Sequence, residues 1–165
     1  MAENTAIVWN PSTTTREDLE SAIPAGVDVS WFETTEDDPG RGAAESALAA
    51  GAGLILAAGG DGTVRAVAEY LAETKASADL GIVPLGTGNL LARNLGVPLN
   101  DISAAVTRAF ENEASTIDIG WADVHVSGDV LRRAFAVMAG FGIDAHMITE
   151  TDDDLKDRAG WLAYV

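Results

Sequence analysis

The stretch Leu54-Ile55-Leu56-Ala57-Ala58-Gly59-Gly60-Asp61-Gly62-Thr63 sets a short apolar run directly before a glycine-rich turn. A helical pattern of apolar residues begins at Val64. The stretch therefore predicts a buried strand, a tight turn and a helix. Paired glycines let a backbone approach a ligand closely, and the first N–H groups of a helix are unpaired and partly positive. We expect the turn to be a loop that can hold phosphate; the alternative is a plain strand-to-helix turn.

A second strand, glycine loop and helix follow. Residues 80–83 have the pattern of another buried strand, and Pro84-Leu85-Gly86-Thr87-Gly88-Asn89 leads into a helical pattern from Leu90. Loops that leave the carboxyl ends of neighbouring parallel strands converge on one crevice, where open α/β folds bind ligands. Neither loop fits a standard phosphate motif, because the chain has no Gly-Lys pair and Leu91 stands where the dinucleotide fingerprint needs its third glycine.

Strands and helices alternate up to about residue 120. Strands are expected at 5–10, 27–32, 54–58, 80–83 and near 116–119, and helices at 16–23, 42–50, 64–73 and 102–110. This order predicts an α/β fold of three layers, with a mostly parallel sheet covered by helices on both faces.

The periodicity changes after residue 120. Apolar and polar residues alternate at 122–126 and 131–138, with a Ser127-Gly128-Asp129 turn between them, which predicts a β-hairpin. We expect one domain at residues 1–120 and the incomplete start of a β-rich second domain at 121–165. The unpaired edge of such a partial sheet predicts a homodimer.

Composition limits the classes of partner. The chain has 26 acidic and 10 basic residues, a formal charge of −16, which argues against nucleic acid and against a basic patch that holds anionic lipid. It has no cysteine, which fits a cytoplasmic setting, and its apolar runs are too short to span a membrane. Acidic runs such as Glu36-Asp37-Asp38 are expected to be solvated surface.

Several motifs in this order resemble the catalytic domain of bacterial diacylglycerol kinases and related lipid kinases, a group that includes sphingosine kinases and is distantly akin to NAD kinases and phosphofructokinases. Besides the two glycine loops, the matching pieces are Asn10-Pro11-Ser12, Thr34-Thr35-Glu36, Ala92-Arg93, Ile117-Asp118-Ile119-Gly120, residues 140–145, and Lys156 with Gly160, Ala163 and Tyr164. The resemblance implies an ATP-binding domain that transfers the γ-phosphoryl group of ATP, with Mg²⁺, to a hydroxyl of diacylglycerol or a similar lipid.

The resemblance also implies roles for individual residues. The residues implied to bind the phosphates are Gly59, Gly60, Asp61, Gly62 and Thr63. Asp61 is implied to be the catalytic residue and to contact the Mg²⁺ network. Further nucleotide contacts fall to Thr87, Gly88 and Asn89, and the rim of the site falls to Asn10 and Thr35.

The chain departs from the family in places. Relatives often carry Asn-Glu where this chain has Arg65-Ala66, although Glu69 lies one helical turn further on, and Leu90-Leu91 replaces their Asp-Phe. Relatives are longer, and their later residues are thought to supply the general base. We therefore expect an amino-terminal part that binds nucleotide more readily than it turns over lipid. We expect it in the cytoplasm, with peripheral contact to the inner membrane face through the missing domain.

Two other functions stay open. An NAD kinase-like enzyme shares the Gly-Gly-Asp-Gly loop, but it predicts the Asn-Glu pair that this chain lacks. A nonenzymatic nucleotide-binding or interaction module is compatible with Arg65-Ala66 and with the length of the chain.

Overall fold

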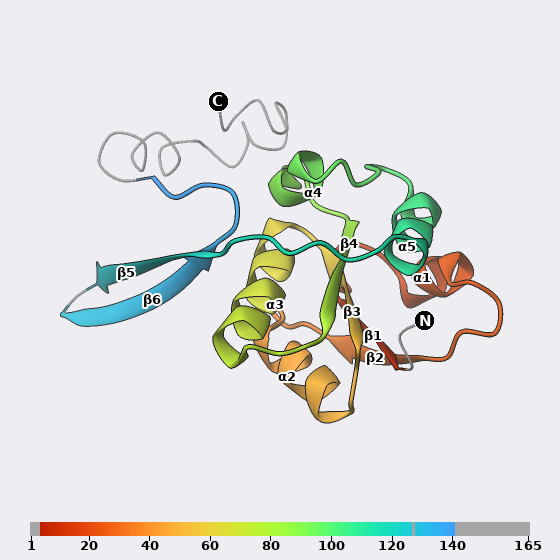
Figure 1. Cartoon of the computed structure of the whole chain (residues 1–165), viewed down its shortest axis with the longest axis horizontal. Helices are drawn as coiled ribbons and strands as arrows, with labels where there is room; N and C mark the ends of the chain where they lie inside the picture. Colours follow the sequence, from red (N-terminus) through yellow and green to blue (C-terminus); the bar gives the residue numbers. More distant parts are fainter. Residues whose placement is uncertain (1–3, 127, 141–165) are drawn as a thin grey trace.

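The computed structural model describes residues 4–126 and 128–140. Figure 1 shows the elements in chain order. The strands are β1 (Thr5–Trp9), β2 (Val29–Glu33), β3 (Leu54–Gly59), β4 (Asp79–Pro84), β5 (Gly120–Val126) and β6 (Asp129–Phe135), and the helices are α1 (Arg16–Ala22), α2 (Arg41–Ala49), α3 (Asp61–Thr74), α4 (Leu90–Asn94) and α5 (Ile102–Glu111).

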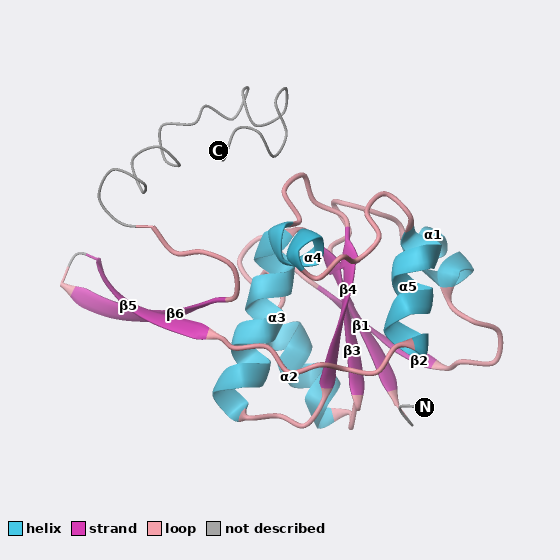
Figure 2. Ribbon diagram, turned by 45° about the horizontal axis from the view of Figure 1, so that its top comes forward, coloured by secondary structure: helices cyan, strands magenta, loops and turns pink. Residues whose placement is uncertain are grey.

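The first four strands form one parallel sheet in the order β2-β1-β3-β4, which Figure 2 shows as a fan between the helices. The chain passes from β1 to β2 on one side and then returns past β1 to reach β3 on the other. The strand order therefore reverses between β1 and β3, and open α/β sheets bind ligands at the carboxyl ends of the strands at such a point.

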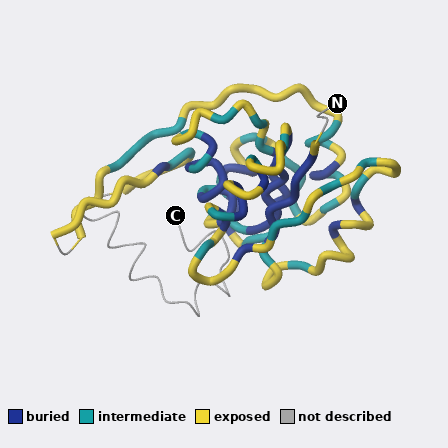
Figure 3. Tube along the Cα trace, turned by 90° about the horizontal axis from the view of Figure 1, so that it is seen from below, coloured by how far each residue is buried: buried dark blue, intermediate teal, exposed yellow. Residues whose placement is uncertain are grey.

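Two apolar layers hold the helices to the sheet. In β1, Ala6 and Val8 face the layer under α2, α3 and α4, while Ile7 and Trp9 face the layer under α1 and α5. Both layers follow from the side-chain periods, because side chains alternate between the two faces of a strand and recur every 3.6 residues on one face of a helix. Figure 3 shows the buried trace concentrated in these central strands. The three-layer α/β fold with a parallel sheet is confirmed.

The hairpin β5–β6 is antiparallel, with register from Gly120↔Phe135 to Val126↔Asp129, and it extends away from the first sheet (Figures 1 and 2). It joins the body at α3, where the buried carboxylate of Glu69 accepts the N–H of Ala134 at 2.8 Å. The hairpin that the sequence indicates is present. The domain division at residue 120 and dimerisation through the hairpin edge stay predictions.

Three expected elements have wrong boundaries. The strand expected at 131–138 lies at Asp129–Phe135, because its pairing ends where Phe135 meets Gly120, the first residue of β5. No strand forms at 116–119, because residues 113–118 are exposed and pair with no strand in the described part of the chain, and β5 begins at Gly120. Helix α3 begins at Asp61 and not at Val64, because Gly60 has an extended conformation and acts as the N-cap. The aspartate of the glycine loop is thus the first residue of the helix.

The motif residues 141–145 and 156–164 lie outside the described residues. Among the helices that the structure describes, none has the length and apolar character needed to cross a membrane.

Gly81 tests the packing between β4 and α5. A Cβ added to this buried glycine would collide with the Leu56 side chain and stand 2.9 Å from the Cβ of Ala109. We expect Gly81→Ala to lower the free energy of unfolding by about 1–3 kcal/mol, the usual cost of overpacking. In the control Gly62→Ala, the new methyl meets nothing within 4 Å in α3, so stability stays equal or rises by up to about 1 kcal/mol. Urea unfolding measures both, and equal midpoints would contradict this packing.

Candidate functional site

The predicted site residues follow strands whose carboxyl ends share one edge of the sheet. Backbone bonds extend the pairing just beyond the strands: the N–H of Asn10 donates to Ala58 O at 3.0 Å, and the N–H of Leu85 donates to Gly59 O at 2.9 Å. The first glycine loop follows β3, the second follows β4, and Asn10 follows β1. The structure therefore brings both loops to the edge next to the reversal of strand order.

The two glycine loops touch through their backbones. A Cβ on Gly86 would lie 2.6 Å from the Cα of Gly60, and a Cβ on Gly60 would lie 3.4 Å from the Cα of Gly86. Real Cβ atoms do not approach a backbone to 2.6 Å, so a side chain on Gly86 would force the loops apart. Glycine at 86 is therefore required by contact between the loops.

The Asp61 carboxylate fastens this contact. Its Oδ2 accepts the N–H of Asn89 and its Oδ1 accepts the N–H of Leu90, both at 2.7 Å. A Cβ on Gly88 would lie 2.7 Å from Oδ2, so this glycine leaves room for the carboxylate. Hydrogen bonds to a charged acceptor are about twice as strong as neutral ones. Asp61 thus joins the start of α3 to the start of α4.

Asn89 shapes the second loop. It is buried and has left-handed backbone angles, φ 50° and ψ 45°, a region that asparagine tolerates better than most residues. Its Oδ1 accepts the N–H of Gly86 at 2.9 Å, and its Nδ2 donates to Gly86 O at 2.6 Å. Arg93 Nε donates to Gly88 O at 2.7 Å and supports the same turn. A side-chain contact from Asn89 to a nucleotide stays a prediction, and it would compete with these bonds.

The start of α3 differs from the starts of other described helices. The Thr15 hydroxyl accepts the Asp18 N–H in α1, the Asp101 carboxylate caps α5, and Asp38 accepts three N–H groups at the start of α2. No such side chain caps α3 at Gly60. The first-turn N–H groups of α3 are the ones left for an acceptor from outside the chain.

The remaining predicted residues fall into three groups. Thr63 is buried against Gly59, where a Cβ would stand 2.6 Å from the Thr63 hydroxyl, so this threonine packs the loop from below. Gly62 and Thr87 are exposed. Asn10 and Thr35 shape their own turns, because Asn10 Oδ1 accepts from the backbone and hydroxyl of Ser12, and the Thr35 hydroxyl accepts the N–H of Asp38 at 3.0 Å.

Asp38 is a residue whose role the sequence analysis missed. We expected solvated surface, yet its carboxylate accepts the N–H groups of Gly40, Arg41 and Gly42 at 2.7–3.0 Å. The available signal was an aspartate just before Pro39-Gly40 and an alanine-rich helix, which is where capping side chains stand.

Glu69, the acidic residue one helical turn after Arg65-Ala66, binds away from the glycine loops. Glu69 Oε2 accepts from Arg65 at 2.7 Å as well as from the N–H of Ala134, and it stands two turns along α3 from Asp61. Glu69 therefore serves the contact with the hairpin and does not replace the missing Asn-Glu pair at the loops.

The donor set limits how Mg²⁺ would be held. Asp61 is the carboxylate that stands between the loops, and each of its oxygens already accepts one N–H. Within residues 4–126 and 128–140, no group of three or more His, Cys, Asp or Glu is placed to hold a metal ion. A carboxylate oxygen keeps a second lone pair, so these residues fit a Mg²⁺ coordinated chiefly by phosphates and water, with Asp61 as a single protein contact.

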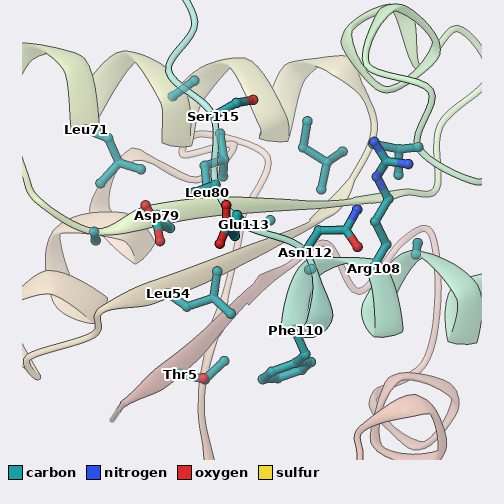
Figure 4. Close-up of a pocket in the computed structure, with 18 of the residues that line it drawn as sticks. Thr5, Leu54, Leu71, Asp79, Leu80, Arg108, Phe110, Asn112, Glu113 and Ser115 are labelled. Atoms are coloured by element: carbon teal, nitrogen blue, oxygen red, sulfur yellow. The ribbon is translucent and has the colours of Figure 1, made fainter. Parts of the chain in front are cut away.

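A cavity of about 1740 Å³ lies elsewhere, at the amino ends of the strands. Figure 4 shows Thr5, Leu54 and Asp79 at its wall, with Glu113 and Ser115 passing close to β4. The residues of the glycine loops do not line it. This space follows the outer edge of β4, which has no strand partner among the described residues.

Comparisons with known proteins identify relatives. Residues 10–122 match the model of the diacylglycerol kinase catalytic domain. A Pseudomonas aeruginosa protein named probable lipid kinase YegS-like is 37% identical over 153 residues, which are 90% of this chain and 47% of that protein. A Bacillus subtilis diacylglycerol kinase is 34% identical over 96% of this chain and 52% of its own length.

Solved structures agree. A diacylglycerol kinase from Bacillus anthracis superposes with a TM-score of 0.54 and 28% identity, over 67% of this chain and 44% of that one. The chain thus spans about half the length of the relatives it matches.

The Asp61 bridge predicts a specific loss of stability. Asp61→Asn places an amide NH₂ against a backbone N–H, so we expect the free energy of unfolding to fall by about 1.5–3 kcal/mol, the value of a hydrogen bond to a charged group. The control Asp37→Asn removes an exposed carboxylate and should stay within about 0.5 kcal/mol. Urea unfolding gives the energies, and amide NMR shifts of Asn89 and Leu90 should move only in the Asp61 variant. Unchanged shifts would show that the bridge is absent in solution.

Proposed function

This chain belongs to the family of diacylglycerol kinase catalytic domains, and on that premise we propose that it binds ATP at the two glycine loops for phosphoryl transfer to a lipid hydroxyl. The observation that carries the proposal is the uncapped start of α3, which faces the point where the loops meet. Unpaired N–H groups and the positive end of the helix dipole favour phosphate there.

Phosphoryl transfer depends mainly on positioning and on neutralising charge, which backbone donors provide without new covalent chemistry. The N–H groups of Asp61, Gly62 and Thr63 are the proposed donors to phosphate oxygens. When bound, Mg²⁺ would neutralise phosphate charge beside Asp61. Asp61 itself keeps the second loop in place, which lets the exposed Thr87 hydroxyl meet the nucleotide from the opposite side.

The acceptor and the setting belong to the same proposal. The lipid would be diacylglycerol or a lipid with a similar hydroxyl, and the protein would work in the cytoplasm with peripheral contact at the inner membrane face. Relatives that carry lipid kinase names are about twice as long as the part this chain matches, so lipid transfer is best tested on a chain of that full length.

A nonenzymatic nucleotide-binding module is the second candidate. The contacts of Glu69 favour this candidate. Glu69 binds Arg65 and the Ala134 N–H of the hairpin, so its carboxylate does not take the place of the Asn-Glu pair that Arg65-Ala66 replaces. An NAD kinase-like enzyme receives no comparable support. The two candidates share the nucleotide site and differ in whether phosphate is transferred.

ATP binding is tested by calorimetry with ATP and Mg²⁺. We expect Thr87→Ala to weaken binding severalfold with no change in stability, because the residue is exposed and loses one hydrogen bond to the ligand. Ser77→Ala, which removes an exposed hydroxyl just before β4 at the opposite end of the sheet from the loops, is the matched control and should bind like the unchanged chain. If the unchanged chain shows no heat of binding with ATP, the nucleotide site is refuted.

Lipid transfer is tested with radiolabelled ATP and diacylglycerol in mixed micelles, using this chain and a version extended to the length of the relatives. We expect labelled phospholipid from the extended version. ATP binding without labelled lipid from the extended version would instead support the nonenzymatic module, and labelled NADP in a parallel reaction with NAD would support the NAD kinase alternative.

A further inference from the structure

Four arginines gather where α2 and α3 face the hairpin. Arg41 starts α2, Arg65 lies in α3, and Arg132 with Arg133 lies in β6. They are four of the 10 basic residues in a chain of charge −16. Figure 1 shows β6 meeting the body beside α3, so the fold brings together cations that are far apart in the sequence.

Two of these arginines are neutralised by glutamates of α3. Arg65 pairs with Glu69 at 2.7 Å, and Arg41 pairs with Glu73 at 2.7 Å while its guanidinium lies 5.0 Å from the ring centre of Tyr70. The hydrogen bond with Glu73 raises the pKa of Arg41. Both pairs contribute little net charge.

Arg132 and Arg133 leave a surplus of positive charge. The Arg132 guanidinium lies 5.3 Å from the ring centre of Trp121, and its carboxylate neighbour Asp123 is 4.0 Å away, with both side chains mostly exposed. Such an exposed, long ion pair is weak. In the described part of the chain, Arg133 donates one hydrogen bond, to Arg132 O at 3.2 Å. Within residues 4–126 and 128–140, most of the ten N–H donors of these two guanidinium groups have no hydrogen-bond acceptor.

These side chains border a cavity of about 430 Å³, here named the arginine cleft. Its lining residues are Arg41, Glu69, Ala72, Glu73, Trp121, Arg132 and Arg133. β6 faces α3 through the Ala134 N–H, so the cleft lies between this strand and the helix. The cleft is therefore a defined concave space with two arginines at its rim.

The cleft is separate from the nucleotide loops. Glu69 and Glu73 follow Asp61 by eight and twelve residues in α3, which is about 12 and 18 Å along the helix at 1.5 Å per residue. No residue of the glycine loops lines it. A ligand in the cleft would not occupy the proposed ATP site.

We propose that the arginine cleft binds the phosphate group of a phosphomonoester. A phosphomonoester carries about −1.5 to −2 charges at pH 7, and it would meet Arg132 and Arg133, the two cleft arginines that no glutamate of α3 neutralises. Planar guanidinium groups suit phosphate because they donate paired N–H groups to its oxygens. The phosphate can belong to a soluble ester or to a lipid headgroup, since both present the same group to the cleft. The inference does not depend on the proposed ATP site.

The test compares two double variants of equal charge. Arg132→Gln with Arg133→Gln removes the surplus, and Arg16→Gln with Lys75→Gln removes two cations outside the cleft, so each has two fewer positive charges than the unchanged chain. Glycerol 3-phosphate is titrated without nucleotide, with intrinsic tryptophan fluorescence and calorimetry as readouts, and ATP binding is measured separately. Phosphatidylcholine vesicles with and without phosphatidic acid are tested by co-sedimentation.

We expect the cleft variant to bind at least about tenfold more weakly and the control variant to bind like the unchanged chain. Binding of glycerol 3-phosphate alone identifies a soluble ester, binding of phosphatidic acid vesicles alone identifies a lipid headgroup, and binding of both identifies the phosphate group as sufficient. Equal weakening in the two variants, or no binding of either probe by the unchanged chain, overturns the proposal. If the unchanged chain binds a phosphate probe but does not bind ATP, the proposed nucleotide site is refuted and the proposed phosphate site in the arginine cleft is not.

Discussion

The bridge from the Asp61 carboxylate to the N–H groups of Asn89 and Leu90 is the interaction on which the candidate site depends. The two hydrogen bonds span 28 and 29 positions of the sequence. They can form because Gly60, Gly86 and Gly88 have no side chains that would keep the two loops apart. With the carboxylate directed at α4, the start of α3 has no capping side chain. One residue thereby holds the two glycine loops together while the first turn of α3 stays without a capping side chain.

Helix α3 connects the glycine loops with the hairpin. It begins at the loop with Asp61, packs its apolar face on the sheet, and holds β6 through the buried carboxylate of Glu69. The same helix supplies Glu69 and Glu73, which neutralise Arg65 and Arg41, whereas Arg132 of β6 has only the long, exposed pair with Asp123.

Much of the fold was predictable because its signals are local. The apolar runs at 54–58 and 80–83, each followed by glycines, place two strands and two loops within a residue or two of where they lie. The prediction of a strand near 116–119 was wrong, because a short run with Ile117 and Ile119 has the same pattern whether or not a neighbouring strand pairs with it. The prediction that Asp38 is solvated surface was wrong, because charge composition cannot distinguish a carboxylate that caps a helix from a solvated one.

The sequence by itself determined the α/β class and the positions of both glycine loops, since propensity, periodicity and glycine spacing act over a few residues. The family was indicated by the resemblance of several motifs in their order along the chain. Only the tertiary structure decided that Asp61 spans the loops, that Asn89 is closed on Gly86, and that Glu69 faces the hairpin. The arginine cleft is also tertiary, because it unites residues of α2, α3 and β6 in a chain whose overall charge is acidic. Hydrogen bonds and charge pairs between distant residues depend on chain direction and packing, which no local pattern encodes.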